Sequence, residues 1–243
     1  MYPRRLLIAA GVAAFLAGLL VLAPLGQWLR LAPPAVAQRI SAPTGTLWQG
    51  SAQIATSGGP LQVGWDLHPW RLLLATLQAD WTLAGSGLSA RGTASAAPWG
   101  YGVQVDRGEL AGERISGVSG GRAVADQPLQ FQDIGLGLAP DGRIEEASGR
   151  LAWGPGTVRL SDRPEPLALP ALRGYLREAD GRLKVQVDGE NEPGAPLATL
   201  TLDPVGNLLQ LVVTHRAARL AGVAPAAPAA PDAAFLELSQ PLR

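Results

Sequence analysis

The chain has 243 residues, of which 47% are hydrophobic and 16% charged, and its 20 basic and 20 acidic side chains cancel to a formal net charge of zero. This apolar content excludes a disordered chain, and the neutral balance excludes a protein that binds nucleic acid through a net positive field. Cysteine is absent, which rules out disulfides, thiolate nucleophiles and sulfur-ligated metals. The 30 glycines and 21 prolines favour many short strands joined by tight turns.

The N-terminal segment predicts a membrane anchor. Residues 6–23 carry no polar side chain, and Leu25 extends the run. At about 1.5 Å per residue this run spans roughly the ~30 Å hydrocarbon core of a bilayer. Arg4 and Arg5 precede it and Trp28 follows it, as is typical of a span with interfacial flanks.

A cleaved signal peptide is the alternative interpretation of this segment, because residues 35–37 (Ala-Val-Ala) have the small-x-small form of a cleavage site. The apolar run is longer than the roughly 7 to 15 residues usual for such a peptide, and a long spacer separates it from residue 35. We therefore expect an uncleaved anchor in the inner membrane, spanning once, with the bulk of the chain in the periplasm.

Beyond the anchor, the residues alternate between apolar and polar with period two, which predicts strands that have one dry and one wet face. At Asp133 the phase of the alternation slips, which predicts a β-bulge. The alternation is found in residues 61–67, 77–83, 101–105, 183–187 and 198–202. Turn residues are found at 85–87, 141–142, 180–181, 188–189 and 203–206.

Three short segments that open with proline, residues 33–40, 69–74 and 170–177, are predicted to be helical. The predicted fold class is all-β, an antiparallel, curved or open sheet with one or two short helices, preceded by a single N-terminal transmembrane helix. The domain boundaries that we expect are residues 1–27 for the cytoplasmic tail and anchor, 28–44 for a juxtamembrane segment, 45–221 for the periplasmic β-domain, 222–234 for an Ala/Pro linker, and 235–243 for a C-terminal strand or docking tail.

Few residues qualify as catalytic. His68 shares a strand face with Asp66 and could form half of a metal site, but an exposed histidine on a wet face explains it better. His215 is read as a strand-end residue. The carboxylate pairs Glu145–Glu146 and Glu190–Glu192 lie in polar stretches that are predicted to be turns. The sequence thus predicts no enzyme, no catalytic residue, no cofactor and no metal site.

Tryptophan and glycine recur together at the start of the β region. We expect the tryptophans to point into one core and the glycines to permit tight turns or close strand approach. The residues concerned are Gly45, Thr46, Leu47, Trp48, Gly50, Trp65, Pro69, Trp81 and Gly85.

An N-terminal anchor followed by G-T-L-W-x-G, W-x-L-x-P and W-x-L-x-G segments resembles protein N of the type II secretion system. The resemblance covers most of the chain, with its specific motif confined to residues 45–85. It implies an inner-membrane protein with one span, whose periplasmic β-domain accompanies the apparatus that exports folded proteins through the outer membrane. It also implies an accessory or assembly role, with other secretion subunits and the inner membrane as partners.

Two other functions remain open. The fold expectation is similar to AsmA-like periplasmic sheets that cradle lipid, so lipid is a further candidate partner. A periplasmic hydrolase is the weakest alternative. In every case we expect no nucleic acid partner. The C-terminal segment, with Phe235, Leu236 and Leu238, is the candidate partner-binding strand.

Overall fold

The computed structural model describes residues 26, 40–56, 59–118, 123–161, 165–220, 222 and 230–241. The predicted anchor, all but the last residue of the helix predicted over residues 33–40, and most of the Ala/Pro linker lie outside the described residues. Within the described ranges, no helix is long and apolar enough to cross a bilayer.

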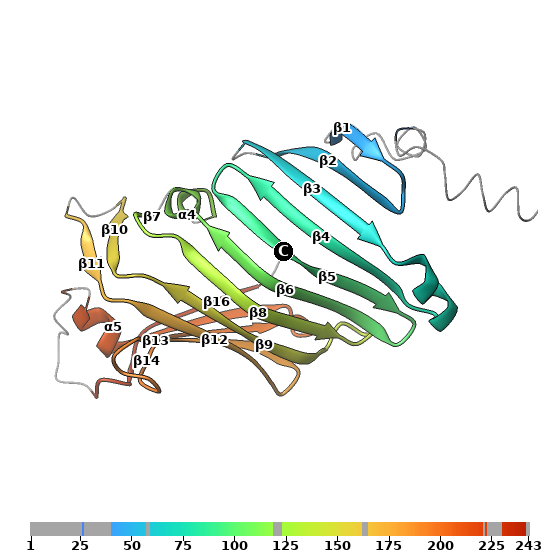
Figure 1. The fold of residues 1–243 in the computed structure, drawn as a ribbon. Helices are drawn as coiled ribbons and strands as arrows, with labels where there is room; N and C mark the ends of the chain where they lie inside the picture. The colour runs from blue at the N-terminus through green and yellow to red at the C-terminus, as the bar shows by residue number, and fades with distance from the viewer. Residues whose placement is uncertain are drawn as a thin grey trace, which may run out of the picture.

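Among the described residues, one antiparallel sheet of 13 strands is the main element, which confirms the antiparallel all-β prediction (Figure 1). Its spatial order follows the chain from β1 to β16, leaving out β7, β10 and β11, which form a second sheet in the order β11-β10-β7. The first half of the main sheet comprises β1 (Ile40–Gly45), β2 (Gln49–Thr56), β3 (Gly59–Leu67), β4 (Leu77–Gly85), β5 (Leu88–Ala97), β6 (Gly100–Leu110) and β8 (Leu129–Leu138). The second half comprises β9 (Ile144–Trp153), β12 (Leu172–Ala179), β13 (Arg182–Gly189), β14 (Pro196–Asp203), β15 (Leu208–Thr214) and β16 (Ala234–Pro241).

The remaining elements are short. The 3₁₀-helix η1 (Pro69–Leu74) confirms the helix predicted there and joins β3 to β4. The small sheet comprises β7 (Ala123–Ala125), β10 (Gly156–Leu160) and β11 (Leu167–Leu169). The α-helices whose bounds fall within the described ranges are α4 (Gly112–Val118) and α5 (His215–Leu220).

The five alternating segments lie in β3, β4, β6, β13 and β14, as predicted, whereas three other predictions are wrong. Residues 172–177 are not helical but belong to β12, because Leu172 and Leu176 alternate with polar residues and β9 and β13 pair with both edges of the strand. Glu145 and Glu146 lie within β9 rather than in a turn. Asp188 lies inside β13, 2% exposed, and the turn begins after Gly189.

The bulge predicted at Asp133 is confirmed. Asp133 has a φ of 51°, in the left-handed region, and the register between β8 and β9 shifts between Gln132 and Gly135. The extra residue restores the common apolar face of β8 after the phase slip, because residues on both sides of the bulge then point to the same side of the sheet.

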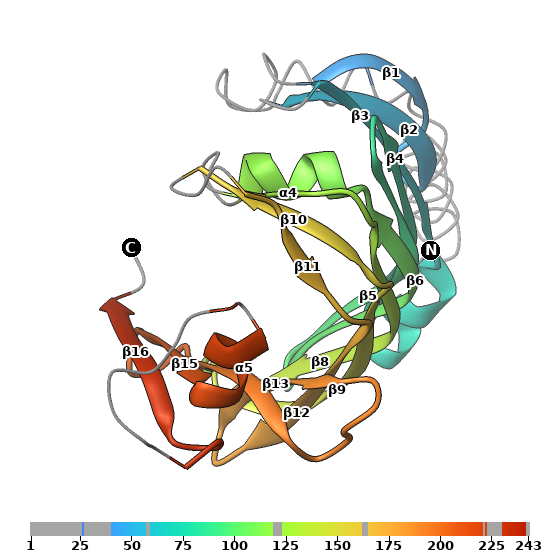
Figure 2. The ribbon, with the colours of Figure 1, turned by 90° about the vertical axis from the view of Figure 1, so that its left-hand side faces the viewer.

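Viewed along its strands, the main sheet forms an arc that is open on one side (Figure 2). In β3 the apolar side chains are less exposed than their polar neighbours: Leu61, Val63 and Trp65 are half-buried, whereas Gln62 and Asp66 are exposed. Side chains on the concave side of an arc converge, so they are less exposed than those on the convex side. The less exposed, apolar face is therefore the concave one. The main sheet therefore bends around its own dry face rather than packing against an equal second layer.

An enclosed core exists only in small patches. Figure 2 shows α4, β10 and β11 inside the arc, and Figure 1 shows that they lie near one end of the strands. There the indole of Trp153, 7% exposed, donates to the carbonyl of Gln127 at 3.1 Å, and Ala125 is 4% exposed. The buried apolar residues among those described are Ala52, Ala125, Ala139, Ile144, Ala147, Trp153, Leu197 and Ala218.

Candidate functional site

The turn between β1 and β2 contains the G-T-L-W-x-G segment and is held by its threonine. The hydroxyl oxygen of Thr46 accepts the backbone N–H groups of Trp48 and Gln49, both at 3.2 Å. Gly45 has a φ of 84°, and a Cβ there would lie 2.3 Å from the carbonyl oxygen of Gln49. The threonine and the glycine therefore specify a tight reversal that a larger residue at position 45 would strain.

Trp65 joins this turn to the sheet. Its indole N–H donates to the carbonyl of Leu47 at 3.1 Å. A Cβ on Gly50 would lie only 2.9 Å from Cζ2 of the Trp65 ring. Trp65 is also the register partner of Trp81 on β4. Gly50 thus permits the close approach that we predicted for it.

The prediction that Trp48, Trp65 and Trp81 point into one core holds only for Trp65 and Trp81, which are register partners on one face. All three are half-buried, Trp48 lies in the β1–β2 turn, and the other two lie on the concave face. The remaining motif residues are also structural: Pro69 opens η1 and Gly85 ends β4. The motif forms the corner that begins the sheet, with no catalytic arrangement among these residues.

Apolar side chains line the concave face in rows that follow the strand register. One row runs across five strands through the register pairs Leu176–Val185, Val185–Leu200, Leu200–Leu211 and Leu211–Leu238. The first four of these residues are half-buried, and Leu238 is 52% exposed. Because the strand backbones are already paired to their neighbours, this surface offers side-chain methyl groups and few polar atoms.

The C-terminal segment is a strand of the sheet. β16 pairs with β15 from Leu208–Pro241 to Thr214–Ala234, which places Leu236 and Leu238 on the concave face. The ring of Phe235 packs edge-on against His215 with centroids 5.3 Å apart. Among the described strands β16 has only one neighbour, so its outer edge is open.

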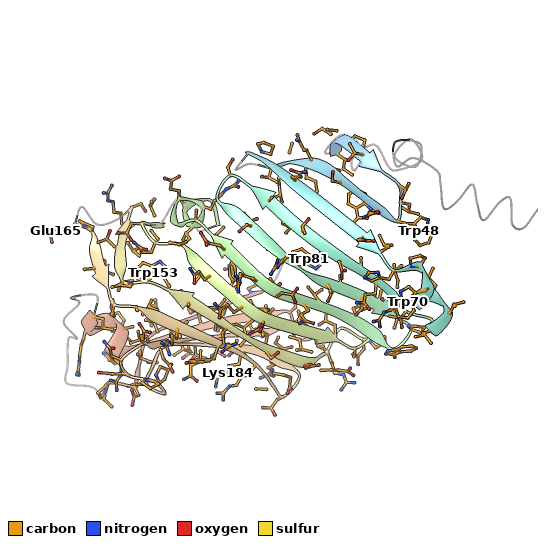
Figure 3. The ribbon with its side chains drawn as sticks, in the orientation of Figure 1. Trp48, Trp70, Trp81, Trp153, Glu165 and Lys184 are labelled. Carbon is orange, nitrogen blue, oxygen red and sulfur yellow. The ribbon has the colours of Figure 1, made fainter. Side chains whose placement is uncertain are left out.

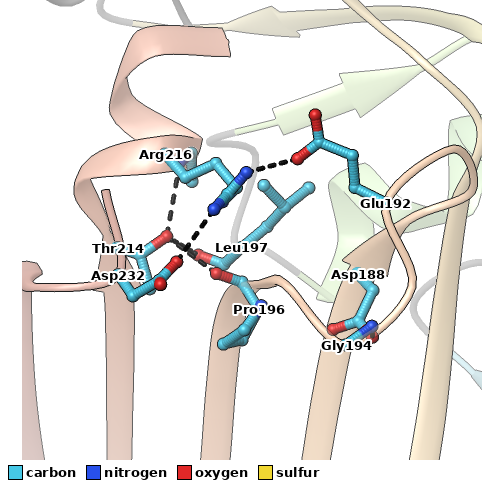
Figure 4. A network of polar contacts seen from close by, with 9 residues as sticks. Asp188, Glu192, Gly194, Pro196, Leu197, Thr214, Arg216 and Asp232 are labelled. Atoms are coloured by element: carbon cyan, nitrogen blue, oxygen red, sulfur yellow. Dashed lines mark hydrogen bonds and ion pairs between the residues drawn. The ribbon is translucent and has the colours of Figure 1, made fainter. Parts of the chain in front are cut away.

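A polar cluster attaches β16 to the domain (Figure 4). The guanidinium of Arg216 on α5 donates to the carboxylates of Glu192 and, at 3.1 Å, of Asp232, and the Asp232 contact raises the pKa of Arg216. The backbone N–H of Arg216 donates to the carbonyl of Pro231 at 2.9 Å. The Thr214 hydroxyl donates to the carbonyl of Pro196 at 2.9 Å. The cluster thus joins α5, the β13–β14 turn and the residues leading into β16.

The residues considered for catalysis are not brought together. His68 Nε2 lies 3.1 Å from a carboxylate oxygen of Asp80, in a part-exposed pair. Glu190 pairs with Arg173, and Glu192 with Arg216. No three His, Cys, Asp or Glu side chains in the described part of the chain are placed to hold a metal ion.

Sequence reasoning missed an exposed apolar surface at one end of the sheet. The turns at this end include η1 and the β5–β6 turn, which are neighbours because Leu77 pairs with Ala96. Figure 3 places Trp48 and Trp70 at this end and Trp153 at the other. The strongly exposed side chains are Trp70 at 57%, Leu72 at 47%, Leu73 at 89%, Leu74 at 61%, Trp99 at 64% and Tyr101 at 56%. The sequence signal that could have revealed this surface is the group of aromatic and leucine residues that follows Pro69 and Pro98.

These features define a class of protein: a curved antiparallel sheet with an accessible apolar face and, among the described strands, an open C-terminal edge. The family model of the type II secretion system protein N matches residues 38–241. The chain therefore belongs to the type II secretion system protein N family, which confirms the resemblance inferred from its motifs. No curated protein and no solved structure matches the chain.

Proposed function

We propose that the chain is an accessory or assembly subunit of the type II secretion system, held in the inner membrane by one N-terminal span with its sheet in the periplasm. Membership of the protein N family is the observation that carries the secretion role. The apolar run of residues 6–23 supports the anchor, since it has the length and flanks of a membrane span. The proposed role is contact with other subunits, without catalysis.

Topology is tested with a C-terminal alkaline phosphatase fusion, which should be active because this enzyme matures in the periplasm. The mature protein should begin at or next to Met1. N-terminal sequencing that begins at Gln38 would contradict the anchor, because cleavage after Ala37 removes the apolar run.

The open edge of β16 is the proposed contact site for another secretion subunit. A strand with one neighbour leaves alternate N–H and C=O groups free to pair with a strand of another chain. A photocrosslinking residue at Ser239 should capture a secretion component. The same probe at Gln104, exposed but in the middle of the sheet, is the control. Equal capture at both positions would contradict edge pairing.

Deletion of the gene should lower secretion of type II substrates. Folded cargo should accumulate in the periplasm while general export across the inner membrane continues. A partial defect is consistent with an accessory role, whereas unchanged secretion would contradict the proposal.

Lipid binding is a second candidate function, favoured by the concave apolar surface. Each methylene that leaves water contributes about 0.8 kcal/mol, so about ten methylenes yield roughly 8 kcal/mol before the costs of association. An acyl chain fits a surface whose backbone is already paired, because it brings no polar group that needs a partner.

Lipid binding can be tested at two adjacent residues whose side chains lie on opposite faces of the sheet. Val185 lies on the concave row and Lys184 on the opposite face. Mass spectrometry of the purified full chain should detect bound phospholipid. Val185→Asp should lose that lipid and Lys184→Asp should retain it. Equal lipid content in both variants would exclude the concave face as the binding surface.

A further inference from the structure

We infer that the end of the sheet formed by η1 and the β5–β6 turn inserts into the surface of a lipid bilayer. The inference rests on the proposed membrane anchoring and adds a second, peripheral contact between the domain and the membrane. We call this surface the apolar tip and define it by Trp70, residues 72–74, Trp99 and Tyr101.

The composition of the apolar tip suits the boundary between headgroups and acyl chains. Leu73 is 89% exposed, and the indoles of Trp70 and Trp99 are more than half exposed. Leucine enters the acyl region, while indole prefers the interface because it joins an apolar ring to a polar N–H group. Arg71 lies over the Trp70 ring with its Cζ 4.8 Å from the centroid, which places a cation next to the aromatic group. That cation complements the phosphate groups of lipids.

The backbone of η1 is already hydrogen-bonded, which insertion into lipid requires. The N–H of Ala75 donates to the carbonyl of Leu72 at 3.0 Å, and the N–H of Thr76 donates to that of Arg71 at 3.2 Å. Arg71 in turn donates its N–H to the carbonyl of His68 at 3.1 Å. Ala75, with a φ of 53°, closes the helix in the left-handed conformation. The exposed leucines are thus presented on a short, internally paired element.

The length of chain outside the structure allows this contact. Leu25 ends the apolar run and Ile40 begins β1. The intervening chain reaches at most about 50 Å, at ~3.3–3.6 Å per residue. The six-residue strand β1 then leads toward the apolar tip over about 20 Å. A domain on such a tether can place its tip on the membrane that holds its anchor.

The absence of cysteine makes a direct test possible, because an introduced cysteine is the only labelling site in the whole sequence. The full chain carries an environment-sensitive NBD fluorophore at Leu73→Cys or at Trp99→Cys. It is reconstituted into vesicles of phosphatidylethanolamine and phosphatidylglycerol, some containing lipids with quenching nitroxides on the acyl chains. Leu220→Cys is the matched control, because Leu220 is also exposed, at 42%, but lies on α5 at the opposite end of the sheet.

Both tip labels should shift their emission to the blue and lose most of it to nitroxide lipids, while the label at position 220 should stay accessible to aqueous iodide. Adding Leu74→Glu to the Leu73→Cys protein should abolish the lipid quenching. The inference is overturned if the tip labels remain as accessible to iodide as the control. It is also overturned if they shift only when other secretion subunits are added, because the tip would then bind protein.

Extraction with alkaline carbonate separates this inference from the proposed anchor. A chain that resists carbonate but carries a water-exposed tip label retains the anchor and refutes the tip contact. A chain that carbonate releases, although lipid quenched its tip label beforehand, refutes the anchor and retains the tip contact.

Discussion

At the residue scale, Gly50 and Trp65 determine how the first strands meet. A Cβ on Gly50 would lie 2.5 Å from the carbonyl oxygen of Thr44 and 2.9 Å from the Trp65 ring, so backbone or indole must move. We expect Gly50→Ala to cost about 1–3 kcal/mol, the range for overpacking. Gly154→Ala is the control, because its nearest neighbour is a flexible side-chain oxygen at 3.6 Å. Equal midpoints of urea unfolding for the two variants would contradict this prediction.

Trp48 shows how the exposure of a side chain limits the stability that is lost when it is truncated. A fully buried tryptophan costs about 3–5 kcal/mol when it is truncated to alanine. Because Trp48 is half-buried in a turn, Trp48→Ala should cost less than that range. Urea unfolding of the variant measures the difference, and a loss within the full range would mean that the turn supports more of the sheet than its exposure indicates.

The hydrogen bonds of Asp203 predict that the stability of the fold depends on pH. Its carboxylate accepts the N–H of Gly206 at 2.7 Å and that of Arg182 Nε at 2.9 Å. The bond from Gly206, followed by the Arg182 charge, lowers the pKa of Asp203 below its ordinary value of 3.8. A carboxylate whose pKa is lowered in the folded state stabilises the fold at pH values above its pKa in the unfolded chain. This stabilisation is lost as the pH falls through its pKa in the folded state.

Asp203→Asn should therefore lower the unfolding midpoint near neutral pH. The difference from the native chain should shrink as the pH falls from about 4, near the unfolded-state pKa, through the lower pKa of the folded state. The prediction is checked by measuring the unfolding midpoints of both proteins at pH values from neutral to below about 4. A difference that does not vary with pH would assign the effect to the lost turn geometry rather than to charge.

At the element scale, Arg216 is expected to hold β16 in place. It contacts Asp232, next to the strand, and Glu192 in the β13–β14 turn. Arg216→Ala should accelerate hydrogen exchange of the β16 amides, because β15 is the only described strand that pairs with β16. Arg150→Ala removes a comparable exposed pair, with Asp133 at 2.6 Å in the middle of the sheet, and should leave β16 unchanged. Identical exchange in both variants would contradict the role of Arg216.

β12 shows where an element could be misread from sequence. Proline at position 170 suggested a helix start, yet Leu172 and Leu176 lie two strand periods apart, and Gly174 between them packs against Leu151. Strands on both sides supply the pairing that outweighs the local helical signal. The strand prediction for β3 succeeded because its alternation is uninterrupted from Leu61 to Leu67.

At the scale of the whole molecule, the uncovered concave face predicts stabilisation by an acyl ligand. A ligand that binds only the folded state adds RT ln(1 + [L]/Kd), about 2.7 kcal/mol at a hundredfold excess over Kd. A lysophospholipid below its micelle concentration should therefore raise the melting temperature of the native chain and of Lys184→Asp. Val185→Asp should gain little. An equal rise in all three proteins would mean that the lipid binds elsewhere.

The sequence by itself determined the strands with uninterrupted alternation, the turns at Asp141–Gly142 and Asp180–Gly181, the bulge at Asp133 and the protein N resemblance. These depend on alternation, backbone preferences and motifs that neighbouring residues carry together. Only the tertiary structure decided that the apolar face lies inside an open arc and that η1 meets the β5–β6 turn in one exposed tip. Period-two alternation is the same in a sandwich, a closed barrel and an open sheet. Curvature and pairing between distant residues decide whether the dry face is covered, and no local pattern encodes them.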